Sequence, residues 1–285
     1  MKIGIIGSNG FIGKNLKNHL SKKKEFTVFT FSSYKKLKHN WSNKVTNEII
    51  KKKPDLIINC SASQLLTEDK KSILNLLNSN VYSNIFFLNE AIKNKNFKGY
   101  ITFGTKFEFD AKRNYKPLNF YAATKHANDL FLNYFSLKKK IVTISLKLFD
   151  TYGLNDQRKK ILNLLLDSYK RNKVLSTTAG NQYLDYVHIN EICQLINKIS
   201  IEIKKKKLKG FKVFTVSSKK PIKLKTLIKK LKIILDKKLK VKVGALKYRE
   251  TEPMTPVRNT INYPGWKSKS NLMKEIKKIF DGTND

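Results

Sequence analysis

Short apolar runs alternate with amphipathic stretches over the first half of the chain and again near residue 200. The runs are rich in Ile, Val, Leu and Phe, as buried strands are, and they occupy residues 2–6, 26–31, 56–60, 100–103, 141–148 and 212–216. The stretches between them have helical periodicity and include residues 11–20, 73–93 and 121–135. Strands that alternate with helices in this way predict an α/β fold with a doubly wound parallel sheet.

A glycine-rich turn joins the first predicted strand to the first predicted helix. It reads Gly7-Ser8-Asn9-Gly10-Phe11-Ile12-Gly13. Between a strand and a helix, spaced glycines allow a tight turn and a close approach of the backbone to a pyrophosphate, while the helix N-terminus offers free N–H groups. We therefore expect a Rossmann-type sheet on which all seven residues bind a dinucleotide.

The pattern becomes mixed after about residue 150, with short helices, proline-containing loops and a lysine-rich terminal helix. We therefore expect a dinucleotide-binding Rossmann domain over residues 1–152, to which residues 183–217 return. Residues 153–285 should form mainly a smaller C-terminal substrate-binding lobe. Ligands should bind outside the carboxyl ends of the strands, as they do in open α/β sheets.

The formal net charge of +38 suggests a nucleic-acid partner at first sight. However, the basic residues are almost all lysine and are spread along the chain, with arginine only at positions 113, 158, 171, 249 and 258. Such a distribution is typical of a solvated surface. We expect weak affinity for polyanions in general and no specific nucleic-acid partner.

Cys60 and Cys193 lie within apolar segments and form neither a disulfide framework nor a metal-ligand pattern. We therefore expect no metal site and a reducing compartment. No apolar run approaches the roughly 20 residues that span a bilayer, and the first residues lack a signal-peptide pattern. The sequence thus predicts a soluble, cytoplasmic protein without a membrane partner.

Tyr121 and Lys125 are four residues apart, which places them on one face of a helix. This spacing is common here, because Tyr34, Tyr134, Tyr169 and Tyr263 are also followed by lysine at the fourth position. Only Tyr121 follows a proline-containing loop, precedes small residues and lies downstream of a strand that ends in Gly104-Thr105. The context therefore favours Tyr121 and Lys125 as a functional pair.

With these motifs in this order, the chain resembles the extended short-chain dehydrogenase/reductase family, which acts largely on nucleotide sugars. The likeness spans nearly the whole chain. Residues 103–105, 119–125 and 148–153, with Arg158, are most similar to the branch that contains CDP-abequose and CDP-paratose synthases, which are 4-ketosugar reductases. Further family-like segments are residues 53–62, Asn80-Val81, residues 182–191 and Tyr248-Arg249.

The resemblance implies a catalytic role for Thr105, Tyr121 and Lys125. Tyr121 would exchange a proton with the sugar, Lys125 and an oxidised nicotinamide would favour the phenolate, and Thr105 would donate a hydrogen bond to the reacting oxygen. Dehydratase members have an acidic pair where this chain has Lys106 and Phe107. Elimination of water is therefore not expected. Glu108 should face the other side of an extended segment.

The resemblance also assigns cofactor contacts to Ser61, Ala62, Asn80, Tyr121 and Lys125, although Asn80 could equally be an ordinary helix asparagine. Where NAD binders commonly have a carboxylate after the second strand, this chain has Ser32, Ser33 and Lys35. Hydroxyl and ammonium groups suit a 2′-phosphate, so we expect NADP(H), with NAD(H) as the alternative.

A nucleotide-sugar substrate carries a pyrophosphate, which arginine binds with defined geometry. We expect Arg158, Arg249 and Arg258, together with Thr105 and Lys106, to bind this substrate. Asp185 and His188 match a motif that is largely architectural in the family.

The leading hypothesis is reduction of the C4 ketone of a nucleotide-linked 4-keto-6-deoxy sugar, with Tyr121 as general acid. A nucleotide-sugar 4-epimerase that retains NAD would use the same residues. A non-catalytic NADP- or RNA-binding protein is the alternative from another class. Family members often dimerise through two helices, here residues 80–93 and 121–138. We therefore expect a homodimer with contacts from Phe86, Phe87, Phe131 and Phe135, although core packing explains these residues equally well.

Overall fold

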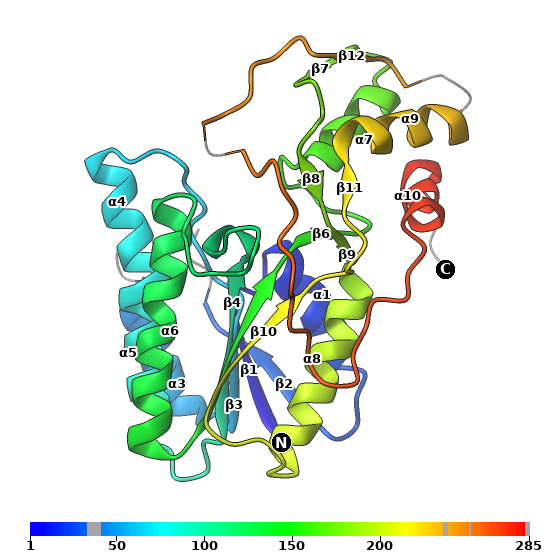
Figure 1. The fold of residues 1–285 in the computed structure, drawn as a ribbon. Coiled ribbons are helices and arrows are strands. Elements are labelled where there is room, and N and C mark those ends of the chain that lie inside the picture. Colours follow the sequence, from blue (N-terminus) through cyan, green and yellow to red (C-terminus); the bar gives the residue numbers. More distant parts are fainter. Residues whose placement is uncertain (33–40, 236–238, 251, 283–285) are drawn as a thin grey trace.

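A six-stranded parallel sheet forms the centre of the molecule in the computed structural model, which describes residues 1–32, 41–235, 239–250 and 252–282 (Figure 1). Each strand corresponds to one apolar run of the sequence. In spatial order the strands are β10 (Phe211–Val216), β5 (Val142–Leu148), β4 (Gly99–Thr105), β3 (Leu56–Asn59), β1 (Lys2–Ile6) and β2 (Thr27–Thr30). The predicted doubly wound parallel sheet is confirmed.

Helices cover both faces of this sheet (Figure 1). On one face, α1 (Phe11–Leu20) and α8 (Ile189–Lys204) bury their apolar stripes in a core with the strands. On the other face, α3 (Trp41–Lys52), α5 (Ser83–Ala91) and α6 (Phe120–Lys139) form a second apolar cluster. Burial on both faces explains why the strands are continuous apolar runs rather than alternating ones.

The single helix expected over residues 73–93 is instead three consecutive segments. It begins as α4 (Lys70–Leu77), passes through one π-helical turn, η2 (Asn78–Tyr82), and continues as α5. A π turn inserts one extra residue and often occurs at functional sites. Here the turn contains Asn80, whose side chain is fully buried.

A smaller lobe lies beyond the carboxyl ends of the main strands (Figure 1). Its apolar core includes Tyr152, Leu165, Leu227 and Ile276. Its helices are α7 (Ile161–Lys170), α9 (Leu224–Ile234) and α10 (Leu272–Asp281). Its two-stranded sheets pair β6 (Asp150–Tyr152) with β9 (Tyr186–His188), β7 (Leu175–Thr177) with β12 (Val241–Val243), and β8 (Tyr183–Leu184) with β11 (Ile222–Lys223).

The segment from β9 through α8 to β10 leads from the lobe back to the main sheet. Asp185 and His188 lie at the start of this segment. The Asp185 carboxylate accepts hydrogen bonds from the hydroxyls of Ser217 and Ser218, and His188 caps α8 through the N–H of Asn190. Among the helices of the described residues, none is long and apolar enough to cross a membrane.

Candidate functional site

The sheet has its topological switch point between β1 and β3. The strand order runs outward in opposite directions from this pair, and ligands of open α/β sheets bind at such a point. A groove of about 1050 Å³ lies there, lined by residues 7–11 after β1, residues 60–63 after β3, and residues 154, 155, 157 and 158 of the smaller lobe. The predicted cofactor residues Ser61 and Ala62 are therefore part of the groove wall.

The glycine turn has the geometry that a dinucleotide needs. Gly7 has a φ of +74°, and a Cβ atom there would lie 2.6 Å from the backbone nitrogen of Ser61. A Cβ atom on Gly13 would overlap the carbonyl oxygen of Gly7. Helix α1 begins directly after Gly10 and has no acidic residue in its first turn. The turn thus leads into the N-terminus of a helix, whose first N–H groups and positive dipole end suit a pyrophosphate.

At the end of β2 the structure shows a carboxylate that the local sequence does not contain. Ser32 donates hydrogen bonds to Glu48 of α3 from its backbone N–H, at 3.1 Å, and from its hydroxyl. The NADP(H) expectation assumed that no acid lies here, so its premise is wrong. Ser33 and Lys35, the other residues of that expectation, lie outside the described residues.

Glu108 interacts with all three residues that are predicted to be catalytic, through a hydrogen bond to Thr105 and through its charge for Tyr121 and Lys125. Thr105 ends β4, and its N–H donates a 2.8 Å hydrogen bond to Glu108. The charge of Glu108 also acts on Tyr121 and Lys125, both on the first turns of α6. The Lys125 ammonium lies 6.0 Å from the centre of the Tyr121 ring. The structure therefore places Tyr121 and Lys125 near each other on α6 and connects Thr105 to Glu108.

The expectation that Glu108 faces away from Thr105 is wrong. Residues Lys106–Glu108 form a 3₁₀ turn, η3, rather than an extended segment. In a 3₁₀ helix, side chains at i and i+3 eclipse each other. The Glu108 side chain therefore points back toward Thr105 and forms a capping box with it.

Glu108 belongs to a buried ionic network that sequence reasoning missed. The Lys147 ammonium lies 2.5 Å from a carboxylate oxygen of Glu108 and 2.5 Å from one of Asp129. All three side chains are at most 5 % exposed. Nδ1 of His126 lies 3.7 Å from Glu108, and the His126 ring stacks on Tyr115. The ammonium thus contacts both carboxylates of a group, Glu108, His126 and Asp129, whose ligand atoms lie within 4.8 Å of one another.

Burial and this network set the protonation of Tyr121 and Lys125. Burial raises the pKa of Tyr121 well above its ordinary value, and the charge of Glu108 raises it further, whereas a hydrogen bond with Gln64 lowers it. Burial lowers the pKa of Lys125 to about 8, and Glu108 opposes that shift. At neutral pH the pair is therefore a phenol beside an ammonium.

Asn80 connects the groove to helix α6. Its amide accepts a hydrogen bond from the N–H of Ser63, donates to the carbonyl of Ser63, and donates to the hydroxyl of Thr124. Thr124 in turn donates to the carbonyl of Tyr121. Asn80 therefore holds the loop after β3 against the first turn of α6.

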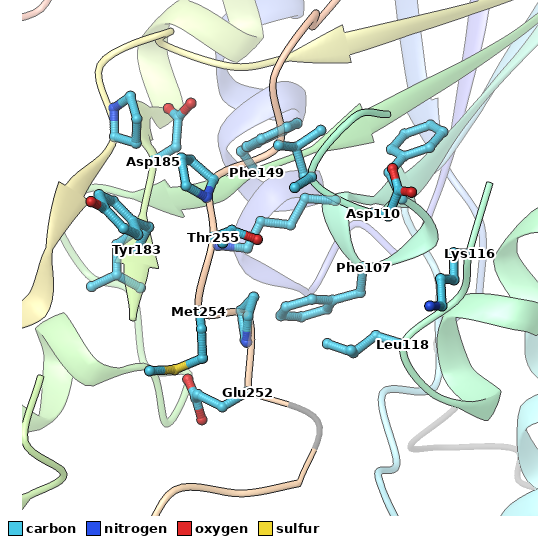
Figure 2. A pocket seen from close by; sticks show the side chains of 18 of the residues that line it. Phe107, Asp110, Lys116, Leu118, Phe149, Tyr183, Asp185, Glu252, Met254 and Thr255 are labelled. Carbon is cyan, nitrogen blue, oxygen red and sulfur yellow. The ribbon is translucent and has the colours of Figure 1, made fainter. Parts of the chain in front are cut away.

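A second cavity, of about 430 Å³, lies between the main sheet and the smaller lobe (Figure 2). Figure 2 shows Met254 and Thr255 between Tyr183 of the smaller lobe and Phe107 of the main domain. Lys106 is on the cavity wall, where its ammonium lies 2.5 Å from the carboxylate of Asp150. The cavity wall therefore includes Lys106, the residue that follows Thr105 in the chain.

The three arginines predicted to bind substrate lie in different places. Arg158 lines the dinucleotide groove, forms an ion pair with Asp156 at 2.7 Å, and stacks on Phe11 at 4.5 Å. Arg249 and Arg258 are exposed and flank residues 252–257, which line the second cavity. The structure therefore separates Arg158 from the other two.

Comparison with known proteins places this geometry in context. The sequence pattern of the NAD-dependent epimerase/dehydratase family matches residues 3–209. CDP-abequose synthase of Yersinia pseudotuberculosis is 28% identical over 217 residues, which cover 69% of this chain and 72% of that protein. GDP-6-deoxy-D-talose 4-dehydrogenase of Aggregatibacter actinomycetemcomitans is 24% identical over 212 residues, or 70% of each chain.

Solved structures share the fold over the full length. UDP-glucuronic acid 4-epimerase from Bacillus cereus, in complex with UDP-glucuronic acid and NAD, superposes with a TM-score of 0.81 at 18% identity and covers 99% of this chain and 98% of its own. RMD from Pseudomonas aeruginosa, complexed with NADPH, has a TM-score of 0.77 at 14% identity and covers 99% of both chains.

Proposed function

The chain belongs to the NAD-dependent epimerase/dehydratase family, and we propose that it reduces the C4 ketone of a nucleotide-linked 4-keto-6-deoxy sugar. The observation that carries this proposal is the buried phenol of Tyr121, with the Lys125 ammonium 6.0 Å from the centre of its ring. Its raised pKa keeps the proton on the hydroxyl at neutral pH, as a general acid for ketone reduction requires.

Each residue has a role in this proposal. A bound reduced nicotinamide would supply a hydride to C4. Tyr121 gives its phenol proton to the C4 oxygen, so that the ketone becomes a secondary alcohol. Thr105 donates a hydrogen bond to the same oxygen as its negative charge develops. The Lys125 ammonium stabilises the phenolate that remains on Tyr121.

The residues after Thr105 favour reduction over elimination of water. Lys106 places an ammonium, paired with Asp150, in the second cavity, and Phe107 places a phenyl ring there. Neither group can act as the general base for elimination. The carboxylate of Glu108 is turned inward and is paired with Lys147.

We assign the sugar to the second cavity and the dinucleotide to the groove at the glycine turn. The smaller lobe, which residues 153–285 mainly form, is then the substrate-binding lobe. In this proposal Arg249 and Arg258, which flank the cavity-lining residues 252–257, bind the pyrophosphate of the substrate. Arg158 supplies a cation to the dinucleotide groove itself.

We further propose a homodimer through α4, η2, α5 and α6. Phe86 and Phe131 are 40% and 39% exposed, whereas Phe87 and Phe135 are buried in the core. Other large apolar side chains are exposed on the same four segments, at Leu74, Leu77, Tyr82, Leu130, Tyr134 and Leu137. A second copy of the chain would cover this apolar face.

The test is turnover of CDP-, dTDP- and GDP-linked 4-keto-6-deoxy sugars with NADH or NADPH, with the products identified by NMR. We expect oxidation of one cofactor molecule for each sugar reduced, and a loss of about a hundredfold or more in kcat for Tyr121→Phe. Tyr134→Phe is the matched control, because Tyr134 lies on the same helix, precedes a lysine at the same spacing, and is 54% exposed. Retained NAD with epimerised sugars would contradict the proposal.

A further inference from the structure

The dinucleotide groove ends at β2, where Ser32 and Trp41 are part of its wall. In doubly wound sheets that bind dinucleotides, the ribose of the adenosine half lies near the end of the second strand. There an acidic side chain binds its 2′-hydroxyl, whereas a basic one accommodates a 2′-phosphate. The groups around Ser32 therefore bear on the choice between NAD and NADP.

The polar groups of Ser32 are all engaged within the protein. Its N–H and hydroxyl both donate to the Glu48 carboxylate, and its carbonyl accepts a 2.8 Å hydrogen bond from the Trp41 indole. Neither donor is available to a phosphate unless Glu48 moves away. Glu48 thus brings a carboxylate from α3, a different element, to the end of β2.

The charge of Glu48 persists at neutral pH. Its side chain is 18% exposed, and the Lys52 ammonium lies 3.4 Å away. Burial alone would raise its pKa, but the hydrogen bonds from Ser32 and the charge of Lys52 lower it below its ordinary value. Lys52 also donates to the carbonyl of Thr30 and lies over the rings of Phe29 and Phe31.

We propose that Glu48 makes this protein select NAD(H) over NADP(H). A ribose 2′-hydroxyl can donate a hydrogen bond to a carboxylate, whereas a 2′-phosphate is repelled by it and finds the Ser32 donors occupied. The inference rests on the proposed function only in taking the groove as the dinucleotide site. It does not depend on the identity of the sugar.

The experiment is isothermal titration of the full-length protein with NADH and with NADPH, in the absence of sugar. We expect NADH to bind at least about tenfold more tightly than NADPH. Glu48→Gln preserves the size of the side chain and an acceptor for Ser32 but removes the charge. This variant should reduce the preference at least about tenfold, mainly through tighter binding of NADPH.

Glu90→Gln is the matched control, because it makes the same change of charge on α5, where Glu90 pairs with the surface residue Lys93. It should leave the preference unchanged. Tighter binding of NADPH to the wild-type protein would overturn the inference, and that measurement does not require any variant to fold. An unchanged preference in Glu48→Gln would also overturn it. Failure to bind either dinucleotide would overturn the proposed function as well, whereas NADH binding without sugar turnover would count against the proposed function alone.

Discussion

Substitution of Lys147 tests how much the buried ion pairs with Glu108 and Asp129 contribute to the stability of the region around the proposed catalytic residues. Lys147→Met removes the ammonium and preserves a side chain of similar length. Glu108 and Asp129 would then face each other within 4.8 Å, with no cation between them. Two buried carboxylates at this separation cannot both stay ionised without a large cost.

The magnitude follows from the protonation that the pair must undergo. To relieve the repulsion at pH 7, one carboxyl must bind a proton, although its ordinary pKa is about 4. Three pH units correspond to about 4 kcal/mol, within the range of about 3–5 kcal/mol that is typical when one partner of a buried ion pair is removed. We therefore expect Lys147→Met to lose about 4 kcal/mol of unfolding free energy at pH 7.

The loss should depend on pH with a definite sign. In the variant, the folded-state pKa of one carboxyl lies above its unfolded value, so the folded protein binds a proton that the unfolded chain releases. The destabilisation therefore grows as the pH rises above the unfolded value near 4 and is smaller at pH 5 than at pH 7. Urea unfolding at both pH values, followed by circular dichroism, measures this difference.

Two further variants show whether charge is the cause. Lys147→Met combined with Glu108→Gln and Asp129→Asn leaves no unpaired charge in the network and should recover most of the lost stability. Lys93→Met breaks an exposed ion pair and should change stability by no more than about 0.5 kcal/mol. A loss below about 1 kcal/mol in Lys147→Met, or no recovery in the triple variant, would refute the reasoning.

Two further predictions concern pH and assembly. Because the pKa of Lys125 is about 8, its ammonium loses the proton above that pH, so kcat/KM for ketone reduction should fall above about pH 8. Lys125→Arg remains charged, so any residual activity of this variant should lack the decline. A wild-type kcat/KM that stays constant up to pH 9 would contradict the role of the ammonium. Phe131→Glu places a charge in the exposed apolar face, so the protein should sediment as a monomer where the wild type sediments as a dimer. Exposed Ile233→Glu on α9, outside that face, is the control, and a monomeric wild type would rule out the dimer.

Sequence reasoning works best where one local segment determines the structure. The predicted bounds of the first strand and of the first helix, Lys2–Ile6 and Phe11–Leu20, agree with the structure. Both follow from apolar periodicity on either side of a glycine turn. The pairing of Tyr121 with Lys125 is also local, because helical spacing alone places the two on one face.

The remaining site residues depend on contacts between distant segments. Glu48 reaches Ser32 across 16 residues, and Lys147 reaches Glu108 across 39. No local pattern specifies either contact. A sequence signal did exist for Lys147, because a lysine within the apolar run of residues 141–148 must be paired if that strand is buried. Glu48 carries no such signal, since an acid on an amphipathic helix is ordinarily exposed.

Burial distinguishes three lysines from the many surface ones in the described part of this chain. Of the 59 basic residues, the lysines that are buried in the described part of the structure are Lys106, Lys125 and Lys147. A buried ammonium is costly unless a carboxylate compensates for it, so each buried lysine needs a specific partner or purpose. Lys106 pairs with Asp150, Lys147 pairs with Glu108, and Glu108 also acts on the charge of Lys125. Lys106 follows Thr105 in the chain, Lys147 pairs with the carboxylate that accepts from the Thr105 N–H, and Lys125 lies near the Tyr121 ring, so burial selects lysines next to the residues that the sequence motifs identified.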